Sequence, residues 1–246
     1  MKNNSYIFTA IILLPLIEQK VNKLKFKKYT DDNNLENTPL INQKFISFAP
    51  NLYLKLGKMH EICGPARIRI AILVAAKTAD LIVWIRPSWE NFIMNTDGIS
   101  DWFSPSQLLF VNTKNRNDLF STTEEVLRSG ISTITITELP VIPSSLQMRR
   151  INLAMASGIK LNNSELSLGL ILSPNKGGAT SIESRWYAST LPCWGSSINK
   201  DGTYLEQKWY VKRLFSRTDP IKEWTIETNT CGKRNIPPKL ISLPIR

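Results

Sequence analysis

The residues best placed to do chemistry lie between a short apolar strand and the helix that follows it. We expect the strand at residues 59–63, a turn of Gly64, Pro65 and Ala66, and a helix over residues 67–79. A glycine turn between a strand and a buried helix presents backbone N–H groups to a phosphate. A working phosphate loop reads G-x-x-x-x-G-K-[ST], and its lysine compensates the phosphate charge. This loop is shorter, lacks the second glycine, the lysine and the hydroxyl residue, and loses an N–H donor at Pro65.

The sequence therefore predicts a degenerate phosphate loop, with no bound cofactor, at Gly64, Pro65, Ala66 and Arg67. Arg67 attracts an anion only weakly, because no nest of N–H groups accompanies it. Glu138 follows a β-branched run and stands where a carboxylate holds Mg²⁺, but without a phosphate loop the ion has nothing to bridge. We expect Glu138 to be a vestigial acid exposed at the end of its strand, and we expect no catalytic residue.

Metal and disulfide chemistry are not indicated either. Cys63, Cys193 and Cys231 show neither C-x-x-C spacing nor a neighbouring histidine, which argues against a zinc site and a disulfide framework. This cysteine usage is typical of a reducing, cytoplasmic compartment. His60 is the only histidine, and no acid or nucleophile pattern accompanies it, so we expect it to be packed in the core.

The elements that position these residues alternate along the chain. Short apolar or β-branched runs predict strands at residues 81–85, 108–111, 131–137 and 167–172. A capping box at residues 121–124 predicts the start of a helix that ends at Gly130, and a second helix is expected from residue 144. This alternation predicts an α/β fold with a mainly parallel sheet flanked by helices.

Beyond residue 192 the pattern changes. The aromatic runs at residues 209–215 and 224–228 predict antiparallel or edge strands, and residues from 234 onward predict an extended tail. The chain therefore divides into an N-terminal extension with a polar linker, a core, and a basic aromatic C-terminal β extension, at residues 1–57, 58–190 and 191–246.

The net charge of +11 lies on the flanks of the chain. Residues 59–190 carry 12 Lys/Arg against 11 Asp/Glu, whereas residues 1–58 carry 9 against 4 and residues 191–246 carry 10 against 5. Basic flanks attract nucleic acid or an acidic partner, and they also keep a protein soluble. The composition leaves both explanations open.

The apolar run at residues 6–17 follows Lys2 and is too short to span a bilayer. It has the appearance of a signal peptide, yet no small-x-small cleavage site follows it. A segment docked on the core, a signal-like sequence and a misplaced start remain open, and we expect the docked segment or the misplaced start.

Several strings over residues 59–190 resemble the RecA-like fold in their order and spacing. V-L-R-S-G at residues 126–130 and the strand ending at Glu138 resemble RecA's helix, its turn and the strand that ends in a metal-binding acid. Residues 148–172 are similar to the next helix and strand, and N-K-G-G-A at residues 175–179 resembles a shortened DNA-contacting loop. H-E-I-x-G-P at residues 60–65 and E-S-R-W at residues 183–186 are similar to the ImuA family, RecA-related and SulA-related accessory proteins of bacterial SOS mutagenesis.

The resemblance implies a fold without the family's ATPase chemistry, because Arg86-Pro87 stands where RecA-type ATPases carry a catalytic glutamate. It implies a cytoplasmic, non-catalytic adaptor of SOS-induced translesion DNA synthesis, with weak or indirect DNA contact and no stable membrane span. The expected partners are RecA, a Y-family-like protein and an error-prone polymerase. A SulA-like inhibitor of cell division and a DNA-dependent ATPase or recombinase paralogue are the alternatives.

The candidate interaction residues are basic or aromatic. Arg185 and Trp186 suit stacking on a base or on a partner, although packing of Trp186 with a solvated Arg185 explains them equally well. We expect the C-terminal extension to recruit a protein partner, because aromatics with Arg and Lys are typical of interface anchors and of stacking platforms. The alternative is that these strands only complete the sheet. The residues concerned are Trp194, Trp209, Tyr210, Arg213, Phe215 and Trp224.

Overall fold

The computed structural model describes residues 45–78, 81–90, 94–95, 97–162, 167–192, 206–229 and 239–245. Ile41–Arg246 is one compact unit, separate from Met1–Leu40. The apolar run at residues 6–17, most of the expected linker, Trp194, Cys193 and Cys231 therefore lie outside the described residues.

Nine strands of the described part form one mixed sheet in the order β11-β10-β9-β8-β3-β7-β6-β4-β5. The six strands from β8 to β5 in this order are parallel to one another, and β9, β10 and β11 continue the sheet from β8 in antiparallel pairs. The predicted α/β class and mainly parallel sheet are confirmed. The strands are β3 (Met59–Cys63), β4 (Ile82–Pro87), β5 (Leu108–Thr113), β6 (Ile134–Glu138), β7 (Leu168–Ser173), β8 (Ser184–Leu191), β9 (Glu206–Ser216), β10 (Lys222–Asn229) and β11 (Lys239–Pro244).

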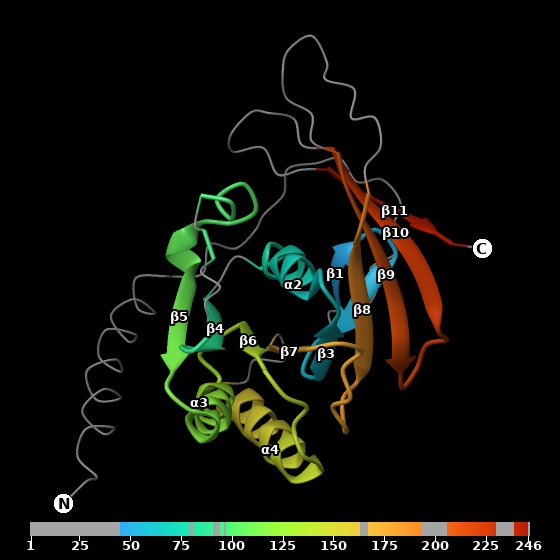
Figure 1. Cartoon of the computed structure of the whole chain (residues 1–246). Helices are drawn as coiled ribbons and strands as arrows, with labels where there is room; N and C mark the ends of the chain where they lie inside the picture. The colour runs from blue at the N-terminus through green and yellow to red at the C-terminus, as the bar shows by residue number, and fades with distance from the viewer. Residues whose placement is uncertain are drawn as a thin grey trace, which may run out of the picture. The chain divides into compact units, whose positions relative to one another are not determined.

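Helices cover both faces of the sheet (Figure 1). One face packs against helix α2 (Arg67–Ala75) and a two-stranded hairpin of β1 (Phe45–Ala49) and β2 (Leu52–Lys55), and this core also receives the tryptophans of β8, β9 and β10. The opposite face packs against α3 (Arg116–Ser129) and α4 (Ser145–Asn162). A single-turn 3₁₀ helix (Pro105–Gln107) precedes β5.

The hairpin corrects the expected boundary at residue 57. Its residues Phe48, Leu52 and Leu54 are each at most 1% exposed, and the Phe48 ring meets the Trp186 ring edge-on at 5.5 Å between centroids. Short strands joined by a tight turn lack the long apolar run that marks a core strand, so the composition resembled that of a linker. Residues 45–55 belong to the core.

Helix α3 begins earlier than predicted. Asn115 is its N-cap, and the Asn115 side chain accepts a hydrogen bond from the Asp118 N–H at 2.9 Å. Thr123 of the predicted capping box is buried inside the helix, where its hydroxyl donates to the Leu119 carbonyl at 2.7 Å. The predicted C-terminus is confirmed, because Gly130 adopts the left-handed conformation that ends helices, at φ +64°.

The expected extended tail differs in a similar way, since part of it is strand β11, which pairs with β10. The Ser242 hydroxyl donates to the Pro50 carbonyl oxygen and so ties this last strand to the hairpin.

Candidate functional site at the carboxyl edge of the sheet

The turn between β3 and α2 is closed against β8. Gly64 has φ +90°, a conformation that favours glycine. A Cβ at this position would lie 2.4 Å from the Ala188 carbonyl oxygen and 2.8 Å from the Tyr187 ring. The Ala66 N–H donates to the same Ala188 oxygen at 3.0 Å. The turn therefore sits directly on a neighbouring strand, with little room for a ligand between them.

Arg67, the first residue of α2, hydrogen-bonds to the same turn. The Arg67 N–H and the Arg67 Nη1 donate to the Gly64 carbonyl oxygen at 3.3 and 3.2 Å. Thus the N–H groups of Ala66 and Arg67 both have protein acceptors. A phosphate at this helix start would have to displace them.

Glu138 is not the exposed carboxylate that we expected. It is half-buried at the end of β6, and the Trp84 Nε1–H of the neighbouring strand β4 donates to its Oε1 at 2.6 Å. Trp84 is fully buried, so its indole N–H requires an acceptor inside the protein. The pKa of Glu138 is raised, mainly because the carboxyl group is buried. The Trp84 hydrogen bond and the positive charges of Arg86 and Arg67 oppose this shift.

Arg86 lies near the end of β4, which pairs with β6, the strand that ends at Glu138. It is 7% exposed, and its Nη2 donates to the Glu90 carbonyl oxygen at 3.2 Å. Because Arg86 acts electrostatically on Glu138, this edge of the sheet holds a guanidinium near an acid already engaged by an indole. The described residues contain no cluster of three His, Cys, Asp or Glu side chains that could hold a metal ion.

The most strongly anchored polar side chain of this region is Glu61, which sequence reasoning did not single out. Glu61 lies in the middle of β3 and is fully buried. Its carboxylate accepts hydrogen bonds from the Gly178 N–H at 3.0 Å and the Ala179 N–H at 3.1 Å. Arg185 Nε donates to it at 2.5 Å, and Arg185 Nη2 donates to the Ala179 carbonyl oxygen at 2.7 Å.

This network fixes the loop at residues 174–183 on the end of β7. A Cβ at Gly177, whose φ is +69°, would lie 2.7 Å from the Glu61 Oε1, so the loop backbone approaches the carboxylate closely. Arg185 is therefore held by Glu61, and the expectation of a solvated Arg185 is wrong. The only sequence signal for the network was an acid inside a short strand whose other residues, apart from His60, are apolar.

The aromatic interaction candidates are mostly core residues. Trp186, Trp209 and Trp224 are at most 3% exposed, because their strands lie inside the sheet and face α2 and the hairpin. The Trp186 and Trp224 rings lie 5.6 Å apart, and the Arg213 guanidinium lies 5.3 Å from each. The indoles thus complete the core, as in the second of our two explanations, and do not form surface anchors.

Two of the aromatic candidates lie nearer the surface. Phe215 is 42% exposed near the end of β9. Tyr210 is half-buried and meets Tyr187 at 6.4 Å between ring centroids. The structure brings Arg213, Trp186 and Trp224 together and places Phe215 and Tyr210 outside that cluster.

His60 is buried, as expected, in a fully paired chain of hydrogen bonds. Its Nε2 lies 2.9 Å from the Lys55 carbonyl oxygen, which can only accept, so Nε2 carries the proton. Its Nδ1 therefore accepts from the Ser184 hydroxyl at 2.7 Å, and the Ser184 oxygen in turn accepts from the Trp186 Nε1–H at 2.7 Å. The neutral imidazole joins the hairpin to β3 and β8.

This arrangement predicts acid sensitivity. Burial lowers the pKa of His60 from 6.5 to about 4. The unfolded chain takes up this proton below about pH 6.5, whereas the folded chain does not until about pH 4, so stability is lost as the pH falls between these values. The slope approaches about 1.4 kcal/mol per pH unit for one proton. We expect a smaller slope in His60→Gln when unfolding free energies are measured from pH 7 to 4.5.

His60 is the only histidine, so no other imidazole titrates in this range, and both proteins carry the same carboxylates. Equal slopes in the two proteins would show that His60 does not control the acid transition.

No described helix has both the length and the apolar character needed to cross a bilayer. No protein-family model and no curated protein matches this chain.

Proposed function

We propose that the chain is a non-catalytic adaptor with a RecA-like fold and a degenerate phosphate loop, similar to the ImuA family and active in SOS-induced translesion DNA synthesis. Its partners are RecA, a Y-family-like protein or the error-prone polymerase assembly. The observation that carries the proposal is the turn of Gly64, Pro65 and Ala66, which is closed against β8 where a phosphate loop would be open.

The strand order supports a RecA-like sheet. With β3 counted as the first of the six parallel strands, the order is 3-2-4-5-1-6. The doubly wound orders 3-2-1-4-5-6 and 2-1-3-4-5 both place the first strand beside the second. Here β6 and β7 separate β3 from β4, so the sheet follows neither of these two orders and a parallel α/β fold different from both is favoured.

The charges at the carboxyl edge support a non-catalytic role. Phosphoryl transfer requires cationic groups around the β- and γ-phosphates and an acid or polar group that orients the nucleophile. Arg86 replaces the glutamate that RecA-type ATPases carry after this strand, and Glu138 accepts the Trp84 hydrogen bond. The closed turn offers no lysine, so the phosphate charge would be uncompensated.

The loop at residues 174–183 supports weak DNA contact. Its residues 175–179 resemble the DNA-contacting loop, but here Glu61 and Arg185 hold the loop against the sheet. Lys176 is its one lysine, and it is exposed. A single phosphate contact gives a shallow dependence of DNA affinity on salt.

The proposal is tested by partner binding. We expect the purified chain to bind RecA or the polymerase proteins of its own source organism, with an affinity that changes little between about 50 and 200 mM salt. The same experiment measures binding to the division machinery and to single-stranded DNA. Binding only to division proteins would favour the SulA-like alternative, and steeply salt-dependent binding only to DNA would contradict the adaptor role.

A further inference from the structure

The Arg69 side chain of α2 lies against two tryptophan rings. Its guanidinium carbon lies 5.8 Å from the centroid of the Trp102 ring and 5.7 Å from that of the Trp209 ring. Two indoles therefore hold this guanidinium between the loop before β5 and strand β9. Contacts of this kind favour the cation and fix the orientation of its planar fork.

No carboxylate of the described part of the chain compensates this charge. Among the described residues, Arg69 has no hydrogen bond and no salt bridge, and it is half-buried. Burial lowers the pKa of Arg69, and no nearby acid opposes the shift. The Arg69 nitrogens are not among the fully buried polar atoms without a partner, so its five N–H donors stay accessible to a ligand.

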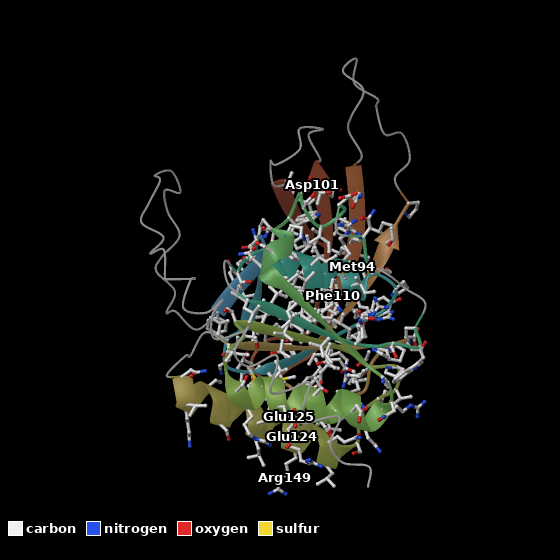
Figure 2. All side chains as sticks on the ribbon, turned by 90° about the vertical axis from the view of Figure 1, so that its left-hand side faces the viewer. Met94, Asp101, Phe110, Glu124, Glu125 and Arg149 are labelled. Carbon is white, nitrogen blue, oxygen red and sulfur yellow. The ribbon has the colours of Figure 1, made fainter. Side chains whose placement is uncertain are left out.

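The guanidinium lines a groove of about 560 Å³ between α2, the segment before β5, and strands β8 and β9. The groove is otherwise mainly apolar, and its apolar lining includes Ile68, Ile72, Met94, Ile99, Leu191 and Trp209. Figure 2 shows Met94 and Phe110 on the side of the sheet away from Glu124, Glu125 and Arg149, so the groove is separate from the α3–α4 layer.

We infer that this groove binds a peptide segment of a partner protein in which a carboxylate stands beside an apolar side chain. The Arg69 fork takes the carboxylate in a bidentate contact, and the apolar lining takes the neighbouring side chain. The inference rests on the proposed adaptor function for the existence of a partner, and it adds the surface and the chemistry by which that partner is recognised.

The neighbouring charges favour a peptide over nucleic acid. A nucleic acid needs a row of cations along its backbone and free aromatic faces for its bases. Arg67 is turned onto the Gly64 carbonyl oxygen, and Lys208 pairs with Glu227 at 3.0 Å. The faces of Trp102 and Trp209 that meet Arg69 are already occupied. The Arg69 guanidinium, in a mainly apolar groove, therefore suits a ligand with a single carboxylate.

The test uses two pools of fluorescent hexapeptides with mixed apolar residues, one with a fixed aspartate at the centre and one with asparagine there. We expect the full chain to bind the aspartate pool about ten-fold more tightly than the asparagine pool in fluorescence anisotropy. Arg69→Gln is expected to abolish this preference. Arg116→Gln, an equal change in net charge at an exposed position, is expected to leave it unchanged.

Arg69→Lys keeps the charge but not the fork, so we expect it to restore only part of the preference. Melting curves of all variants control for folding. Equal affinity for the two pools, or an Arg69-dependent affinity for an oligothymidine but not for the aspartate pool, overturns the inference.

Binding to the proposed partners separates this inference from the adaptor function. If the chain binds RecA or the polymerase proteins and Arg69→Gln binds them equally well, the inference is wrong and the adaptor function stands. If it binds none of them but prefers the aspartate pool through Arg69, the groove stands and the proposed function is wrong.

Discussion

Replacing Glu61 with alanine is expected to lower the free energy of unfolding by about 3–5 kcal/mol, the range for removing one partner of a buried ion pair. Glu61 is fully buried and accepts hydrogen bonds from Arg185 and from two N–H groups of the loop at residues 174–183. Without the carboxylate, the Arg185 guanidinium and both N–H groups lose their acceptor. Urea denaturation of the full chain measures the difference.

Matched variants separate the network from loss of charge in general. Glu125→Ala removes an exposed carboxylate of α3 (Figure 2) and is expected to change stability by no more than about 0.5 kcal/mol. Replacing Glu61 and Arg185 together is expected to cost less than the sum of the two single replacements, because neither partner is then left alone. If Glu61→Ala costs less than about 1 kcal/mol, the carboxylate does not anchor the loop.

Deleting residues 1–50 is expected to abolish cooperative unfolding or to lower stability by several kcal/mol, whereas deleting residues 1–44 is not. The longer deletion removes β1 and with it Phe48, which is 1% exposed and packs on Trp186. The shorter deletion ends before the hairpin begins at Phe45. Thermal melting of the two truncated proteins makes the comparison.

Point variants in the same strand refine this second prediction. Phe48→Ala is expected to cost about 3–5 kcal/mol, as large-to-small changes of buried aromatics do. Phe45→Ala removes an identical side chain that is 45% exposed and is expected to cost much less. Similar losses at the two positions would mean that the hairpin does not belong to the core.

The parallel part of the fold was predictable because its strands are covered on both faces. Such strands read as continuous apolar or β-branched runs, and residues 81–85, 131–137 and 167–172 each overlap an observed strand. The end of α3 at Gly130 was predictable for a local reason, since one glycine supplies the required conformation. These signals lie within a few residues of the element that they predict.

The polar network could not be predicted because its members are distant in sequence. Glu61 meets Arg185 across 124 positions, and neither residue type nor spacing relates the two. The tryptophans of β8, β9 and β10 were misjudged for a similar reason. An aromatic run with Arg and Lys occurs both in exposed platforms and in inner strands. These tryptophans are buried because α2 and the hairpin cover them, and that layer cannot be inferred from the run itself.

The most direct test of the account is whether the turn between β3 and α2 holds a nucleotide. We predict no saturable binding of a fluorescent ATP analogue with Mg²⁺ and no ATP hydrolysis with or without single-stranded DNA, with a RecA protein measured alongside as the positive control. Saturable binding, or DNA-stimulated hydrolysis that is lost in Glu138→Ala, would contradict the claim that the closed turn of Gly64, Pro65 and Ala66 has lost its phosphate chemistry.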